Sequence, residues 1–407
     1  MRTGIRTPWL VVWLGLLATA FAQEPGEPSN YIKGLEALRR NQIEEARSWF
    51  LKAIERKEGV ADLYIRTAGV FDRIGAAAQA IEILKVGVER FPGSAPISAE
   101  LGYFLSTGGR YGEALKAYER AARLDPGNED YRHNAVALLY QIGLDSLRTG
   151  DAMECMSLGR RALEWNAQAP QSHHLLGLAH FALGQLADAS RSLERAAELS
   201  PENARIRFDL ALVYLNQDDM AAAARTLEEV VRVEPGLAMG HLLLGRAYHN
   251  LNRTESALRH FHKAQELDGS LRSLNYHIGY AHKSLGNDDE AIRYMESEIA
   301  RDAGFLLARI ELGELYLRRG RGLEAIEQLN AAIAIDPDVA RSRYLLGKAW
   351  LETGEPAQAA ELLKRAIELD AELTEAYYLL GRAFLAIGSQ AEAEKAFDAF
   401  RRLKESN

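Results

Sequence analysis

Histidine is the residue type in this chain that could most readily build a metal site, because neutral imidazole is a common zinc ligand. Seven of the ten histidines fall in three local groups: His173 with His174 and His180, His260 with His262, and His277 with His282. The only cysteine, Cys155, is a second candidate for chemistry, since a thiolate is a nucleophile. A metal centre and a covalent enzyme are therefore the first hypotheses to weigh.

Neither hypothesis finds a supporting motif. The sequence has no Walker loop, dinucleotide fingerprint, Gly-x-Ser-x-Gly elbow or His-Glu-x-x-His. Catalysis needs acid, base, nucleophile or metal groups that converge in one pocket. Which side chains can converge depends on the elements that carry them, and those elements follow from an internal repeat.

The chain repeats with a period of 34 residues. Units begin at residues 27, 61, 95, 136, 170, 204, 238, 272, 306, 340 and 374, and the eleventh ends at Asn407. A seven-residue insertion at 129–135 is the only break in register. At about 3.6 residues per turn it adds close to two turns, so it predicts a long first helix in the fourth unit. We expect Asn128 to cap that helix and its start to project from one edge.

Small and large residues alternate at fixed positions within each unit. Position 8 is Gly or Ala throughout, and position 20 is Ala in ten units and Cys155 in the fourth. Two helices approach closely only where neither presents a large side chain, so these positions mark where they touch. Aromatic or other large residues at positions 11 and 24 fill the remaining space. Gly or Asn near position 15 ends one helix, and Pro at position 32 ends the next.

This pattern resembles the tetratricopeptide repeat family over residues 27–407. The resemblance implies an all-α solenoid, a right-handed superhelix of eleven helix-turn-helix units in which stacked neighbours supply the core. Departures are mild: Ala37 replaces an aromatic residue in the first unit, and Glu298 stands at position 27 of the eighth.

The repeat positions also change the meaning of the candidate chemical groups. His173 and His241 share position 4, and His180 and His282 share position 11, slots that the family fills with packing residues. Cys155 occupies the small slot between helices, which predicts a buried, inert thiol. We therefore expect no metal, no cofactor and no enzyme activity.

In the family that the chain resembles, first-helix positions 2, 5, 9, 12 and 13 line the concave face. Units 4 to 6 place an apolar stripe there: Tyr140, Leu144, Leu147, His174, Leu178, Phe181, Phe208, Leu212 and Leu215. Two interpretations stay open, burial of the stripe against the next unit and an apolar groove for a helix or extended peptide.

Units 7 to 11 combine basic residues with tyrosines at the same positions. Six basic residues, among them Arg341, stand against Glu314, Glu352 and Glu375, which leaves an excess of three positive charges. Such a surface suits an acidic peptide, a carboxylate or an anionic glycan, and a solvated charged face is the alternative. The predicted ligand-binding residues are Phe208, Arg246, His249, Asn250, Tyr276, Tyr280, Lys283, Arg318, Tyr344, Lys348, Tyr378 and Arg382.

The first 22 residues have the pattern of a secretory signal peptide. Arg2 and Arg6 precede an apolar run at 9–17, and Ala20-Phe21-Ala22 has the cleavage spacing. We expect cleavage after Ala22, a short linker at 23–26 and a periplasmic or secreted product. A membrane-spanning helix needs about 20 apolar residues, so this run is too short to be one. Without Arg2 and Arg6 the net charge falls from -8 to -10, which argues against nucleic acid as a partner.

Two functions of different classes remain. The first is a non-catalytic scaffold or assembly factor that binds protein or peptide partners in the concave groove. The second is binding of a glycan or cell-envelope polymer through the basic, Tyr-rich groove of units 7 to 11. The last unit also lacks a further capping helix. Phe397, Phe400 and Leu403 near its end predict either a helix that solvates itself or contact with a partner or a second copy of the chain.

Overall fold

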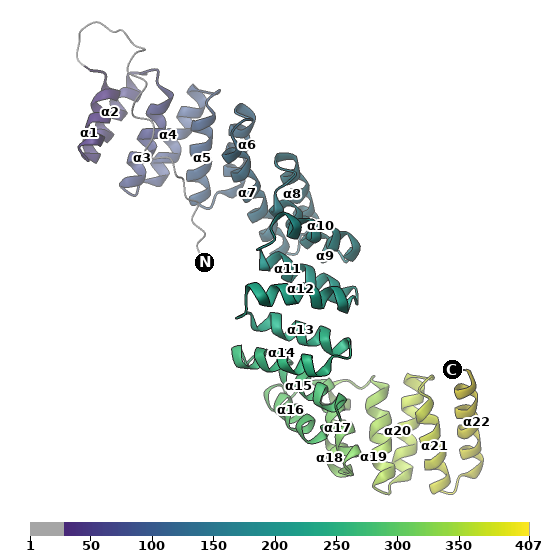
Figure 1. Cartoon of the computed structure of the whole chain (residues 1–407). Coiled ribbons are helices and arrows are strands. Elements are labelled where there is room, and N and C mark those ends of the chain that lie inside the picture. Colours follow the sequence, from purple (N-terminus) through teal and green to yellow (C-terminus); the bar gives the residue numbers. More distant parts are fainter. Residues whose placement is uncertain (1–27, 407) are drawn as a thin grey trace. The chain divides into compact units, whose positions relative to one another are not determined.

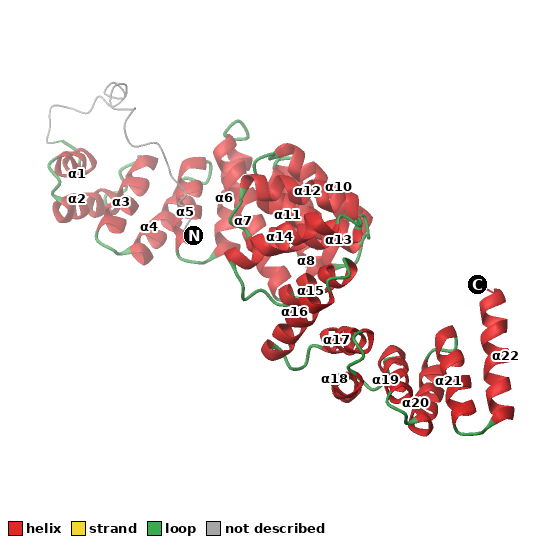
Figure 2. Ribbon diagram, turned by 60° about the horizontal axis from the view of Figure 1, so that its bottom comes forward, coloured by secondary structure: helices red, strands yellow, loops and turns green. Residues whose placement is uncertain are grey.

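A computed structural model describes residues 28–406, and every regular element in that range is an α-helix (Figures 1 and 2). The predicted signal peptide at 1–22 and linker at 23–26 lie outside the described residues. None of the described helices is both long and apolar enough to cross a membrane. The chain divides into two compact units, Met1–Leu175 and Leu176–Asn407, and α9 crosses the division. The all-α repeat fold predicted from the sequence is confirmed.

The described part of the first compact unit runs from α1 into α9. Its helices are α1 (Asn30–Arg39), α2 (Ile43–Glu55), α3 (Ala61–Arg73), α4 (Ala77–Arg90), α5 (Ala95–Thr107), α6 (Tyr111–Leu124), α7 (Glu129–Arg148), α8 (Ala152–Trp165) and the start of α9 (Pro170–Ala182).

The second compact unit continues the same alternation of first and second helices. After α9 it contains α10 (Leu186–Leu199), α11 (Ala204–Asn216), α12 (Met220–Val233), α13 (Ala238–Asn250), α14 (Thr254–Leu267), α15 (Leu274–Ser284), α16 (Asp288–Arg301), α17 (Leu306–Arg318), α18 (Gly322–Ile335), α19 (Ala340–Glu352), α20 (Pro356–Leu369), α21 (Thr374–Ala386) and α22 (Gln390–Ser406). Within each compact unit, a second helix packs on its own first helix and on the first helix of the next pair.

A left-handed residue ends most of the first helices. Gly75 and Gly354 hold φ angles of 74° and 90°, and Asp218 and Asn252 take the same conformation at 61° and 58°. Glycine adopts this region without the steric penalty of a Cβ atom, and Asn and Asp tolerate it better than most residues. The short turn lets the second helix fold back along the first.

The close approach of the two helices in a pair depends on a glycine opposite a large side chain. A Cβ atom added to Gly245 would lie 2.5 Å from the Phe261 ring, and one added to Gly381 would lie 2.6 Å from Phe397. The position 20 residues, all Ala except Cys155, are fully buried. The small residues thus make room for the aromatic side chains that fill the core, as the sequence pattern predicts.

Neighbouring pairs in the second compact unit are also joined by a recurring hydrogen bond. The hydroxyl of Tyr248 on α13 donates to Glu228 on α12 at 2.6 Å. Tyr214 donates in the same way to Glu194 at 2.7 Å, and Tyr316 to Glu296 at 2.6 Å. In repeat numbering, position 11 of one unit binds position 25 of the unit before it. Because the acceptor is a carboxylate, each bond is stronger than one between neutral groups.

The insertion lengthens α7 to 20 residues, and the side chain of Asn128 accepts a bond from the Asp130 amide at 3.0 Å, as expected of a cap. The extension is exposed only in part: Glu129, Asp130 and His133 are exposed, Tyr131 and Arg132 are half-buried, and Ala135 is fully buried. The added turns pack against the protein and leave a hollow beside Trp165 at the end of α8.

Glu298, the departure at position 27, has a clear structural role. Its buried carboxylate accepts bonds from the backbone amides of Ser273 and Tyr276, at 3.2 and 3.3 Å. Ser273 has a φ of 63°, so α15 begins at Leu274, two residues after the start predicted for its unit. The carboxylate thus serves as the N-cap acceptor of this shortened helix.

The last helix does not expose its aromatic residues fully. Phe397, Phe400 and Leu403 are half-buried, and Tyr378 covers both phenylalanines with ring centroids at 6.0 and 5.4 Å. The ammonium of Lys404 lies 5.9 Å from the Phe400 ring centroid. Tyrosine and lysine therefore shield this end of α22 from water.

Candidate partner-binding face

One surface of the second compact unit is built from four consecutive first helices, each in contact with the next (Figure 1). We define this first-helix face as Met239, Arg246, His249 and Asn250 of α13; Tyr276, Tyr280 and Lys283 of α15; Leu307, Glu311 and Glu314 of α17; and Arg341, Tyr344 and Lys348 of α19.

A line of aromatic rings runs from α13 across α15 to the residue that precedes α17. His249 of α13 meets Tyr280 of α15 edge-on at 5.3 Å, and Tyr280 stacks on Tyr276 at 5.8 Å. Tyr276 then lies 5.2 Å from Phe305, the residue just before α17. Burial raises the pKa of Tyr276 to about 12, with help from the nearby carboxylate of Glu311, so its phenol stays neutral. Rings held in this way form a rigid surface with few rotamers to order on binding.

A compact charge network lies next to the aromatic line. Lys283 donates to Glu311 and, at 2.8 Å, to Glu314. Arg341 donates to the same two carboxylates, at 2.7 and 2.5 Å. Burial opposes ionisation of Glu314, but the bonds from Lys283 and Arg341 outweigh it and lower the pKa. Two cations and two anions cancel, so this part of the face carries no net charge.

Three large apolar side chains remain exposed on consecutive helices of the face. Met239 is 38% exposed, Tyr280 37% and Leu307 49%. Arg246 is also exposed and forms no ion pair within residues 28–406. A surface with apolar anchors and a few polar groups has the composition of a protein contact, in which such anchors dominate affinity.

Two histidines hold the turn before their own helix. His173 and His241 place Nε2 at 3.0 and 3.2 Å from the backbone oxygens of Ala167 and Pro235, six residues before each. Arg309, at the same position 4 of its unit, donates to the oxygen of Ala303. In the described part of the chain no three His, Cys, Asp or Glu side chains gather as metal ligands.

Cys155 is a buried thiol. It is fully buried in its small-residue slot, with Sγ 3.6 Å from the oxygen of Leu175. Burial raises the pKa of the Cys155 thiol to about 12, so the nucleophilic thiolate does not form near neutral pH.

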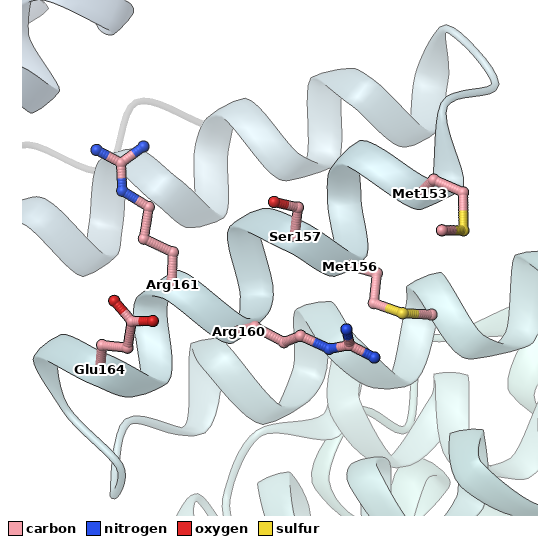
Figure 3. A pocket seen from close by; sticks show the side chains of 6 residues that line it. All are labelled: Met153, Met156, Ser157, Arg160, Arg161 and Glu164. Carbon is pink, nitrogen blue, oxygen red and sulfur yellow. The ribbon is translucent and has the colours of Figure 1, made fainter.

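Two hollows lie in the first compact unit. One of about 390 Å³ lies along α8 and is lined only by residues of that helix, with Arg160 and Arg161 pointing apart (Figure 3). Arg161 is already bound to Glu119 at 2.5 Å. The other, about 360 Å³, lies between the extension of α7 and the end of α8. Neither shows a nucleophile beside a base.

Models of the tetratricopeptide repeat match most of the chain. Matches cover residues 31–95, 95–128, 174–236, 209–271, 276–340, 310–373 and 344–407. The chain belongs to the tetratricopeptide repeat (TPR) family. TPR proteins are scaffolds that bind protein or peptide partners, and the repeats of this chain are of that kind.

Individual relatives of this TPR chain either match only part of its length or have low sequence identity to it. The small glutamine-rich tetratricopeptide repeat-containing protein 2 of Mycosarcoma maydis is 28% identical over 114 residues, which are 28% of this chain and about a third of that relative. Among solved structures, Cut9–Hcn1 of the APC/C is 14% identical, covers 93% of both chains and has a TM-score of 0.48. A TPR protein from Parabacteroides merdae is 20% identical and covers 61% of this chain and 98% of its own, with a TM-score of 0.47.

Eight of the twelve binding residues predicted for this TPR chain are among those that define the first-helix face. His249, Tyr276 and Tyr280 form the aromatic line, and Lys283 belongs to the charge network. The face also includes Arg246 and Asn250, both exposed, and Tyr344 and Lys348, both half-buried.

The other predicted binding residues lie outside the first-helix face. Phe208 is half-buried and packs on the core between α11 and α13, and Arg318 pairs with Asp288 of α16 at 2.6 Å. Tyr378 covers α22, and Arg382 is exposed on α21 beyond the defined face. Of the four tyrosines predicted for the groove of units 7 to 11, Tyr276 and Tyr280 stack on each other, whereas Tyr378 lies against the phenylalanines of α22.

The apolar stripe of units 4 to 6 is not an open surface. Its side chains are half-buried, except His174, which is buried with Nδ1 2.8 Å from the Tyr140 hydroxyl. Of the two interpretations that the sequence left open, burial within the repeats therefore agrees better with the structure.

The net positive charge of the basic stretch in units 7 to 11 is lower than predicted. Glu311 and Asp288 pair with its basic residues and reduce the excess from three positive charges to one. Both lie outside the first-helix positions used for the prediction. A glutamate at position 6, where Leu243, Leu345 and Leu379 stand in other units, was the signal that could have revealed Glu311.

Proposed function

We propose that this chain is an exported, non-catalytic scaffold that binds a protein or peptide partner across the first-helix face. The observation that carries the proposal is the exposure of Met239, Tyr280 and Leu307 on three consecutive first helices, beside a rigid aromatic line. Burying such side chains against a partner contributes about 25 cal/mol per Å² of apolar area removed from water.

The partner that fits has an apolar anchor and a carboxylate near it. The anchor would pack on Tyr280 and Leu307, and the carboxylate would meet Arg246, a cation of this face without an ion pair among the described residues. A polyanionic glycan fits less well, since Lys283 and Arg341 are already bound to Glu311 and Glu314. A partner with both groups would be held in one orientation.

The exported setting is supported by the residues at 1–22, whose charge, apolar run and Ala20-Phe21-Ala22 match a secretory signal. We infer a periplasmic or secreted product on this ground.

Site-specific photo-crosslinking tests the binding face. A photoreactive phenylalanine is placed at Tyr280 or Leu307, and, as the matched control, at Leu323 of α18, which is 75% exposed but belongs to a second helix. In an extract of the source cells we expect the first two positions to capture the same protein and Leu323 not to capture it. Equal capture from all three positions, or capture from Leu323 alone, would refute the proposed face.

A further inference from the structure

Six of the ten histidines lie on three consecutive helices, α13 to α15, whereas α17 to α22 contain none. They are His241 and His249 of α13, His260 and His262 of α14, and His277 and His282 of α15. Most of these rings touch another of the six or an aromatic ring beside it, so they form one cluster around the joint between the seventh and eighth pairs.

The first part of the cluster replaces the hydrogen bond found at other joints. At the start of two other pairs, a tyrosine of α13 or α17 donates to a glutamate of the preceding pair. At the joint of α14 with α15, His282 stands in the place of the tyrosine and His262 in the place of the glutamate. Their ring centroids are 6.4 Å apart, and both rings lie against Tyr294 of α16, at 6.3 and 5.7 Å. Two imidazolium ions here would repel each other, whereas the tyrosine and glutamate pair attracts.

Charged neighbours on α16 do not remove this repulsion. Glu290 favours the charged form of His282, but burial, His262 and Arg293 oppose it, and the net effect lowers the pKa of His282. Asn287 lies 3.5 Å from Nδ1 of the same ring.

The second part of the cluster is a pair of facing ring nitrogens. Nδ1 of His241 lies 3.0 Å from Nδ1 of His260, and Nε2 of His241 faces the backbone oxygen of Pro235 at 3.2 Å. In its neutral form His241 therefore donates through Nε2 and accepts at Nδ1 from His260. When both rings are protonated, two Nδ1–H groups face each other and this bond is lost.

The surroundings of His260 favour its neutral form. The Tyr248 ring lies 5.5 Å from His260. Burial, His241 and Arg259 lower the pKa of His260, and Glu228 of α12 opposes them in part.

The third part is His277, stacked on Phe261 of α14 at 5.8 Å and in edge contact with Tyr276 at 5.3 Å. Burial lowers the pKa of His277 to about 3, assisted by Arg246 and His249 of α13. Burial also lowers the pKa of His249, which lies against Tyr280. No carboxylate is among the groups that shift His277.

We propose that the joint between α14 and α15 is acid-sensitive: protonation of its histidines loosens the packing of the eighth helix pair on the seventh. The short helix α15, which begins after left-handed Ser273, is the element that gives way. His249, Tyr276 and Tyr280 lie across the same joint, so loosening would also weaken partner binding. The weaker partner binding rests on the proposed function, whereas the loosening of the joint does not.

The direction of the effect follows from proton linkage. In the unfolded chain a histidine has a pKa of about 6.5, so it binds a proton below that pH. In the folded chain the pKa values of His249, His260, His277 and His282 are lowered, so these four rings stay neutral to a lower pH. The stability of the joint is therefore fully present above about pH 6.5 and falls as the pH is lowered. For His277 alone, opening becomes about tenfold more favourable between pH 7.5 and pH 5.5.

Hydrogen exchange measured by mass spectrometry at these two pH values, with labelling times matched for the intrinsic rate, tests the proposal on the full chain. We expect peptides from α14 and α15 to open at least about tenfold more at pH 5.5. Peptides from α19 to α22, which contain no histidine, are the internal control. Equal changes in both regions, or no change in α14 and α15, would overturn the proposal.

A repaired joint provides the matched variant. His262→Glu with His282→Tyr introduces the pair used at other joints, and His277→Leu introduces the residue found at Leu243 and Leu345. We expect this variant to lose most of the acid response, and an unchanged response would count against the proposal. If the variant does not fold, an NMR titration of the unaltered chain decides: His277 should remain neutral at pH 5.5, and a pKa of about 6.5 or above would refute the acid-sensitive joint.

Discussion

Arg341 on α19 donates to the buried carboxylate of Glu311 on α17, with 2.7 Å between Nη1 and Oε1. A basic residue expected from the sequence to face a ligand is thus bound within the repeats. Lys283 of α15 reaches the same carboxylate, so the charges of this face tie three first helices together.

Removing the Glu311 charge should destabilise the second compact unit. In Glu311→Gln the amide keeps the shape of the side chain, but Lys283, whose side chain is only 13% exposed, loses one of its two carboxylates. We expect a loss of about 1–3 kcal/mol, measured by urea unfolding. Glu375→Gln, at an exposed carboxylate on α21, is the control and should change little. Equal unfolding curves for Glu311→Gln and the unaltered chain would show that the network contributes nothing.

Two glycine substitutions should have opposite effects on the free energy of unfolding. In Gly245→Ala the new methyl group meets the Phe261 ring, and we expect overpacking to cost about 1–3 kcal/mol. In Gly69→Ala, within α3, no atom lies within 4 Å, so greater helix propensity should stabilise by up to about 1 kcal/mol. Urea midpoints measure both. A harmless Gly245→Ala would mean that the helices of this pair can separate without loss.

The Cys155 thiol should be unreactive in the folded protein. Its pKa is raised to about 12 by burial, so both thiolate content and access are low at pH 8. We expect a thiol reagent to label native protein at least about 100-fold more slowly than protein in urea. Rapid labelling under native conditions would indicate an open fourth repeat.

Export should leave Gln23 as the first residue. Expression of the full chain in a secreting host, followed by intact mass measurement of the exported protein, should show loss of residues 1–22, as their pattern indicates. Retention of Met1 on a membrane-bound product would instead indicate an uncleaved anchor.

The fold was predictable from the sequence because its rules are local and repeat many times. Small residues at positions 8 and 20 and a turn residue at position 15 recur in unit after unit, and each has one steric reason. The exception, α15, begins late because Glu298 and left-handed Ser273 cooperate across 25 residues. Such a contact has no signature in the periodic pattern.

The candidate face was predictable only in part. Tyr276 and Tyr280 stack on one helix face, as residues at positions 5 and 9, one turn apart, can do. Ion pairs between helices were not identified, because the partners of Arg341 and Arg318 lie 27 to 30 residues away. Whether such side chains meet depends on the direction in which each one points, and the repeat numbering alone does not give that direction.

Affinity for the protein captured at Tyr280 is the most direct test of the partner-binding face. Calorimetry would compare the unaltered chain with the double variant Tyr280→Ala and Leu307→Ala, and with Leu323→Ala as the matched exposed control. We predict at least about 30-fold weaker binding for the double variant, the equivalent of about 2 kcal/mol, and unchanged binding for the control. Equal affinity for all three proteins would contradict binding on the first-helix face.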